Sequence, residues 1–194
     1  MTGSVFPVGH YNGARDAEQA VRVGWSRHRL DADAFAVWVL AHGVPEVGKG
    51  NWTVADVVAH CTDTGVDAPG KHLEKLADSG LIAVVEDDPA SAAQFAHRHR
   101  MDVLFVGLGN APEQLEGHAV GIPGLGTAAV LDPECYELWQ WGSVAPTLWH
   151  SCEVRATVVA EPAARPDPDA ALTEILGDLR FLLAHGCAYL DVVG

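Results

Sequence analysis

The chain has 194 residues, of which 48% are apolar and 20% charged, and its formal net charge is −14. This composition is that of a globular protein that can bury a sizeable core in one large or two small domains. The negative charge opposes non-specific attraction to phosphate and argues against a protein that coats nucleic acid.

The sequence shows no membrane or export signal. No apolar run approaches the roughly 20 residues that cross a bilayer, and residues 1–13 lack the basic and apolar regions of a secretory signal. The four cysteines form no Cys-x-x-Cys pair, which indicates small buried hydrophobic residues in a reducing compartment. We therefore expect a cytoplasmic protein.

Charge is distributed unevenly along the chain. Residues 1–100 hold nine Lys and Arg against thirteen Asp and Glu, a net charge of −4, whereas residues 101–194 hold three against thirteen, a net charge of −10. Any surface that faces an anion must therefore lie in the first half.

Three helix signals and an apolar strand follow one another between residues 30 and 86. Asp31 is placed to cap a helix that ends at Gly43, and residues 53–56 form a capping box ahead of a second, short helix. Asp67 begins a third helix, and residues 81–85 are typical of a strand. The predicted order is helix, helix, turn, helix, strand.

This order resembles the winged helix-turn-helix proteins, in which the helix after the turn usually contacts DNA. That helix corresponds to residues 67–79, whose outer face carries Lys71, His72 and Lys75. Lys71 and Lys75 are four residues apart and so share one side of the helix. The alternative interpretation is an ordinary solvated helix face, because Glu74 lies between them.

Ahead of this unit, residues 14–29 place apolar side chains at helical spacing and basic ones near the end. We expect an extra amphipathic helix in an N-terminal arm, residues 1–29. Such a helix often pairs two subunits, which makes a homodimer a candidate; packing on its own domain is the alternative.

After the predicted strand, the run from His97 to Arg100 offers Arg98 and Arg100 as phosphate contacts. No cysteine or carboxylate cluster accompanies its two histidines, so we predict no metal site.

Residues 103–110 are similar to the opening strand and loop of peptidyl-tRNA hydrolases, which would make Asn110 a substrate contact. The turn-rich residues that follow do not continue an alternating α/β enzyme. We expect the first unit to span residues 30–110 and a glycine-rich linker to span 111–130.

The second unit, residues 131–194, repeats the order of the first. Helix signals begin at Asp132-Pro133, at Pro146 and at Asp167-Pro168, and an apolar strand closes the chain. An internal duplication explains this repetition, although any helical protein can repeat such endings. Its aromatic residues form a candidate pocket or interface, with a domain core as the alternative: Tyr136, Trp139, Trp141 and Trp149.

The second unit also shows a faint similarity to the winged-helix peptide chaperones of ribosomal-peptide maturation, carried by a few apolar positions around residues 130–139.

The overall prediction is an α+β, mainly helical fold: tandem winged helix-turn-helix units with an extra N-terminal helix. The leading functional hypothesis is a DNA-binding transcriptional regulator that uses the first unit. The alternative is an acidic protein- or peptide-binding adaptor that does not bind DNA. We predict no enzyme activity and no cofactor, because no acid–base pair, nucleophile or metal cluster is evident.

Overall fold

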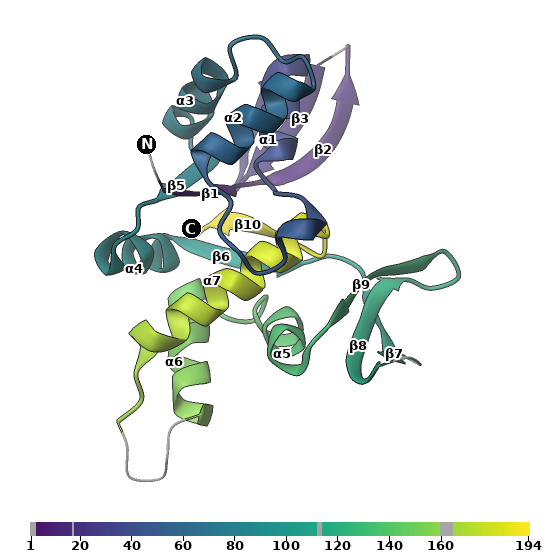
Figure 1. Ribbon diagram of the computed structural model, residues 1–194, viewed down its shortest axis with the longest axis vertical. Helices are drawn as coiled ribbons and strands as arrows, with labels where there is room; N and C mark the ends of the chain where they lie inside the picture. Colours follow the sequence, from purple (N-terminus) through teal and green to yellow (C-terminus); the bar gives the residue numbers. More distant parts are fainter. Residues whose placement is uncertain (1–2, 17, 112–113, 160–164) are drawn as a thin grey trace.

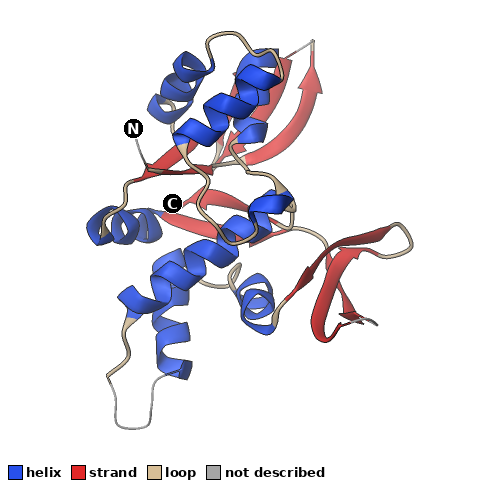
Figure 2. Cartoon of the chain, viewed as in Figure 1, coloured by secondary structure: helices blue, strands red, loops and turns tan. Residues whose placement is uncertain are grey.

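The structure is a computed structural model that describes residues 3–16, 18–111, 114–159 and 165–194. Within these residues one order of elements occurs twice: a strand, a three-stranded meander, three α-helices and a closing strand (Figures 1 and 2). Helix α4 (Pro89–Arg98) joins the two halves. No helix in this part of the chain is long and apolar enough to cross a membrane.

The elements of the first half precede α4. They are β1 (Ser4–Pro7), β2 (His10–Arg15), β3 (Glu18–Val23), β4 (Ser26–Leu30), α1 (Ala32–Leu40), the 3-10 helix η1 (Pro45–Val47), α2 (Val54–Asp63), α3 (Pro69–Asp78) and β5 (Ile82–Val85). The elements of the second half follow α4. They are β6 (His99–Val103), β7 (Val106–Ala111), β8 (Gln114–Ile122), β9 (Gly126–Leu131), α5 (Pro133–Trp141), α6 (Leu148–Val159), α7 (Pro168–Ala184) and β10 (Ala188–Val192).

In each half the first strand pairs with the last. β1 and β5 are antiparallel, with Val5 opposite Val84, and β6 and β10 are antiparallel, with Met101 opposite Leu190. The meanders β2–β3–β4 and β7–β8–β9 form two separate antiparallel sheets. Helix α1 packs on the first meander and α5 packs on the second.

Side-chain caps begin most of the helices, as the sequence predicts. The oxygens that accept a backbone N–H of the first turn belong to Asp31, Thr53, Asp132 and Asp167. Helix α3 differs from the prediction. Its N-cap is Ala68, in a left-handed conformation with φ of 46°, and Asp67 does not cap it. The predicted order of three helices and a strand is observed in both halves.

The prediction of an N-terminal helix is wrong, and so is the mainly helical fold class. Residues 14–29 form the end of β2 and nearly all of β3 and β4, and the described residues contain four sheets. Positive φ angles at Asp16 (54°) and Gly24 (53°) allow the tight turns. Ala20 and Val21 point to opposite faces of the sheet and are both buried. The strand therefore lacks the polar alternation that would have identified it.

The range predicted as a glycine-rich linker is also a sheet. Residues 111–130 include strand β8 and most of β9. Gly121 is needed there for close approach, because a Cβ atom on it would lie 2.2 Å from the carbonyl oxygen of Gly126. The relationship of the chain to winged-helix proteins stays a prediction.

Two apolar clusters form the core, and β1 lies between them. Val5 belongs to the cluster of the first half, whereas Phe6, which points the opposite way, belongs to the cluster of the second half. Arg180 of α7 reaches the same place: its guanidinium lies 4.3 Å from the centre of the Phe6 ring and donates to the carbonyl of Val5. The two halves therefore pack against each other through β1.

Candidate functional site

The predicted recognition helix lies on the surface. Lys71 and Lys75 are exposed on α3, and His72 is partly buried beside them. Glu74 and Asp78 are exposed on the same helix, so two carboxylates accompany its two ammonium groups. Helix α3 alone does not present an excess of positive charge.

Arg98 and Arg100 do not extend that surface. Arg98 ends α4, and Arg100 lies on β6, where it forms an ion pair with Asp102 at 2.8 Å. In Figure 1, α3 lies near the upper end of the molecule, whereas α4 and β6 lie near its middle. The five residues predicted to contact DNA are therefore distributed over three elements.

Three arginines of the first meander form ion pairs with carboxylates, whereas Arg27 of β4 is exposed. The pairs are Arg15 with Asp16 (3.7 Å), Arg22 with Asp191 (3.4 Å) and Arg29 with Glu18 (3.1 Å). A phosphate group that approached this sheet would compete with carboxylates already in place. These pairs reduce the attraction of the first meander for a nucleic-acid backbone.

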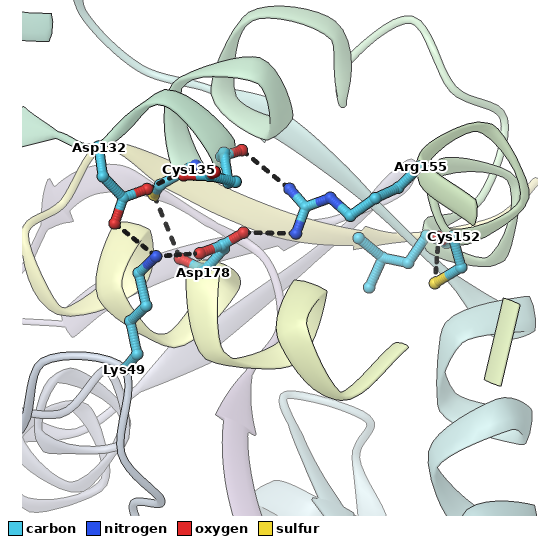
Figure 3. Close-up of polar contacts among 8 residues, drawn as sticks. Lys49, Asp132, Cys135, Cys152, Arg155 and Asp178 are labelled. Carbon is cyan, nitrogen blue, oxygen red and sulfur yellow. Dashed lines mark hydrogen bonds and ion pairs between the residues drawn. The ribbon is translucent and has the colours of Figure 1, made fainter. Parts of the chain in front are cut away.

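A cluster of linked ion pairs centres on Asp178 of α7, which is 2% exposed (Figure 3). Its two oxygens bind Lys49 Nζ and Arg155 Nη1, each at 2.7 Å. Lys49 Nζ also lies 2.6 Å from Asp132, and Arg155 Nη2 donates to the carbonyl of Glu134 at 2.8 Å. The buried carboxylate is thus compensated on both sides.

This cluster joins the two halves of the chain. Lys49 comes from the connection between α1 and α2, whereas the other groups come from α5, the residue that caps it, α6 and α7. A cavity of about 750 Å³ opens beside Lys49 and Asp132 and is also lined by Cys135 and Phe181. Of the charged groups in the cluster only Lys49 and Asp132 line this cavity, together with Glu116.

The chemistry of these groups does not favour catalysis. Burial opposes the charge on Lys49, but its hydrogen bonds to Asp132 and Asp178 outweigh that effect and raise its pKa, so the amine stays protonated. Burial raises the pKa of the Cys135 thiol well above its usual range and that of Cys152 to about 12. Neither the amine nor the thiols are therefore available as nucleophiles near neutral pH.

The aromatic residues predicted to form a pocket have separate roles. Trp139 is buried, and its indole N–H lies 3.2 Å from the carbonyls of Leu104 and Cys187. Tyr136 stacks on His118, with ring centres 4.1 Å apart. These two side chains belong to the packing between α5, the second meander and the start of β10, which is the alternative that the sequence left open.

The other two predicted aromatic residues lie nearer the surface. Trp149 is partly buried, stacks on His97 at 4.6 Å and donates to Glu153 at 3.2 Å. Trp141, at the end of α5, is 62% exposed. Asn110, suggested by the hydrolase resemblance, lies on β7 and donates to the carbonyl of Leu115.

Trp141 lines a groove of about 240 Å³ between α5 and α6, which we call the α5–α6 groove. The groove is lined by Glu137, Leu138, Trp141, Gly142, Val144, Ala145, His150, Ser151, Val154, Arg155, Val158 and Ile175. Three of its valines are unusually exposed: Val144 by 77%, Val154 by 51% and Val158 by 71%. A compact apolar patch of this kind marks an interaction site more often than isolated exposed residues do.

The surface around the groove is acidic. Residues 101–194 contain three cations, and two of these are directed inward: Arg155 pairs with Asp178, and Arg180 is 2% exposed. Glu137 lines the groove, and Glu153 is exposed on α6. Asp178 and Asp191 are buried as well, so the charge that the second half presents to solvent stays close to its net charge of −10.

The spacing of the valines in α6 is a signal for this groove that can be found in the sequence. Val154 and Val158 are four residues apart, so they lie on one side of α6, while Leu148, Cys152 and Ala156 occupy its buried side.

Comparison of the chain with protein-family models, with curated proteins and with solved structures found no match.

Proposed function

We propose that this protein is a non-enzymatic adaptor that binds a basic, amphipathic segment of a partner protein in the α5–α6 groove. The observation that supports this proposal is the groove itself, in which apolar side chains face solvent within an acidic surface. An amphipathic helix laid into a hydrophobic groove is a common mode of peptide recognition.

The apolar part of the groove would supply affinity. Fully burying a valine side chain contributes about 1.5–3 kcal/mol. Because Val158 is 71% exposed and Val154 is 51% exposed, covering each of them would contribute about 1–2 kcal/mol. Trp141 offers a larger surface of the kind that dominates protein interfaces.

The acidic surroundings would supply selectivity and rate. Glu137 at the groove and Glu153 beside it favour lysine or arginine on the polar side of the partner segment. Complementary charge increases association rates more than it increases affinity. Binding is therefore expected to slow with added salt and to persist through its apolar contacts.

The first half shows what kind of side chain fits at this position. Helices α1 and α5 each have nine residues and begin one residue after a capping aspartate, so Leu40 and Trp141 are equivalent. His60 and Val154 are likewise each the seventh residue of α2 and α6. In the first half Trp52 fills this place, donating to the carbonyl of Leu40 at 2.8 Å and lying 4.7 Å from the ring of His60.

No residue of the short connection from α5 to α6 is a tryptophan, and the equivalent position in the second half is the groove. The partner segment is therefore proposed to insert an aromatic side chain between Trp141 and Val154, as Trp52 does between α1 and α2.

The test is fluorescence anisotropy with a labelled helical peptide of leucine, lysine and one tryptophan. Val158→Asp is expected to weaken binding at least ten-fold, because it removes apolar contact and buries a carboxylate. The matched control is Thr157→Asp, which adds the same charge at the neighbouring exposed position of α6. Equal affinity for both variants and the unaltered protein would refute the proposal, and so would equal binding of a glutamate-for-lysine peptide.

A DNA-binding regulator remains the second candidate, and the exposure of Lys71 and Lys75 four residues apart on α3 favours it. Gel retardation with genomic fragments over a salt titration tests it. Retardation that is strong at low salt and is lost in the Lys71→Ala, Lys75→Ala double variant would support DNA binding. Absence of retardation at the lowest salt would exclude it.

A further inference from the structure

A separate cavity of about 400 Å³ lies between the two halves, away from the α5–α6 groove. Its walls come from β2, from α1 and from the region around the end of α7 and β10. They consist of Gly9, His10, Tyr11, Phe35, Trp38, Val39, His42, Gly43, Leu104, Leu183, Ala184, Gly186, Ala188 and Tyr189. The volume lies within the range of small-molecule sites, which often form at the junction of two structural units.

The lining of this cavity is uncharged. None of its fourteen residues is Asp, Glu, Lys or Arg, although such residues make up 20% of the chain. Nothing in the walls would compensate the charge of an ionic ligand, and burying an unpaired charge is costly. The cavity therefore favours a neutral molecule.

Aromatic rings form much of the wall. The rings of Tyr11 and Phe35 are 5.2 Å apart and those of Phe35 and Trp38 are 5.8 Å apart, while Tyr189 lies 4.7 Å from His10. The indole N–H of Trp38 already donates to Val8, and the Tyr11 hydroxyl donates to Gln19. Their aromatic surfaces remain, and such surfaces stack well on another planar ring.

His42 supplies a polar group of fixed character. Its Nδ1 lies 3.1 Å from the carbonyl oxygens of Trp38 and Val39, which can only accept, so Nδ1 carries the proton. Burial lowers the pKa of His42 to about 4, which keeps the ring neutral near pH 7. Nε2 is therefore a hydrogen-bond acceptor, and it lies on the ring edge away from those carbonyls.

We propose that this cavity binds an uncharged, planar aromatic molecule with one N–H or O–H donor, of the indole or phenol class. The aromatic walls would stack on its ring, and His42 Nε2 would accept its hydrogen bond. The wall is built from both halves of the chain, so a bound molecule would contact both. This site is independent of the partner segment proposed for the α5–α6 groove.

The experiment compares indole with benzofuran, which has the same shape but an ether oxygen in place of the N–H. Calorimetric titration at pH 7 is expected to give about three- to ten-fold tighter binding of indole, the contribution of one neutral hydrogen bond. His42→Phe is expected to remove this preference while benzofuran still binds. His97→Phe, the same exchange at an exposed position of α4 outside the cavity, is expected to keep the preference.

A second variant guards against loss of folding in His42→Phe. Val39 lines the cavity and is 44% exposed, so Val39→Trp narrows its mouth without disturbing the core. This variant is expected to weaken both compounds at least ten-fold, with an unchanged circular dichroism spectrum. The proposal is overturned if neither compound binds the unaltered protein at millimolar concentration, if both bind it equally, or if Val39→Trp binds them normally.

Discussion

Replacing Asp178 with asparagine tests the energetic role of the polar cluster. The substitution keeps the size of the side chain but removes the charge that lies 2.7 Å from both Lys49 Nζ and Arg155 Nη1. The Arg155 side chain is only 10% exposed, so water cannot replace the lost carboxylate there. Lys49 is 41% exposed and keeps its ion pair with Asp132. Most of the loss therefore falls on Arg155.

Removing one partner of a buried ion pair usually costs about 3–5 kcal/mol. The lower end applies here, because Arg155 still donates to the carbonyl of Glu134 and because the new amide oxygen of Asp178→Asn accepts one hydrogen bond. We expect a decrease of about 3 kcal/mol in the free energy of unfolding. For a chain of this size the corresponding change in Tm is about 6–12 °C.

Urea unfolding followed by far-ultraviolet circular dichroism measures this loss. The control is Glu174→Gln, which neutralises an exposed carboxylate on the same helix and is expected to change stability by less than about 0.5 kcal/mol. Adding Arg155→Met to Asp178→Asn is expected to recover part of the loss, because no buried charge is then left unpaired. The reasoning is refuted if the free energy of unfolding of Asp178→Asn alone lies within about 1 kcal/mol of that of the unaltered protein.

Three further predictions concern stability. Burial lowers the pKa of His42 to about 4, so the unfolded state binds a proton at His42 before the folded state does as pH falls. Between pH 7 and pH 5 the contribution of His42 to the free energy of unfolding, measured with urea, is therefore expected to decrease by about 2 kcal/mol. His42→Gln is expected to make the free energy of unfolding less dependent on pH in this range. Gly9→Ala is expected to lower the free energy of unfolding by more than about 2 kcal/mol, because φ is +102° and a Cβ atom would lie 2.6 Å from the Val21 side chain. Gly13→Ala, where φ is +85° and a Cβ atom would meet open space, is expected to lower it by about half as much in the same assay. Thr53→Ala is expected to lower stability by about 1 kcal/mol by removing the capping box of α2, and an unchanged urea midpoint would contradict this.

Local signals in the sequence were sufficient to predict most of the helices. A capping aspartate or threonine acts within its own first turn, so the starts of α1, α2, α5 and α7 can be inferred without knowledge of the rest of the fold. The repeated order of helices and strands follows from these same signals.

The sheets could not be predicted in this way, because strand pairing is set by distant segments. β1 pairs with β5, which lies about eighty residues later in the chain, and β6 pairs with β10 at a similar separation. Residues 14–29 contain enough apolar spacing to suggest a helix, and only pairing across the meander decides for strands. Propensity is a weak guide when tertiary contacts oppose it.

The candidate sites depend on the same long-range arrangement. Nothing near Lys49 in the sequence indicates that it binds Asp178, and nothing near His42 indicates that Tyr189 shares its cavity. The excess of carboxylates in residues 101–194 was visible from composition alone. What composition cannot show is that Arg155 and Arg180 are directed inward.

One difference between the two halves explains both the polar cluster and the open groove. The connection from α1 to α2 spans residues 41–53, whereas the connection from α5 to α6 spans only residues 142–147. The longer connection carries Lys49 to Asp178 of the second half and places Trp52 between α1 and α2. The connection from α5 to α6 is too short to reach across to the other half or to place a side chain between its own two helices. The first half therefore fills its own groove and binds the second half, whereas the second half leaves Trp141 exposed, where the proposed partner segment would supply the equivalent cover.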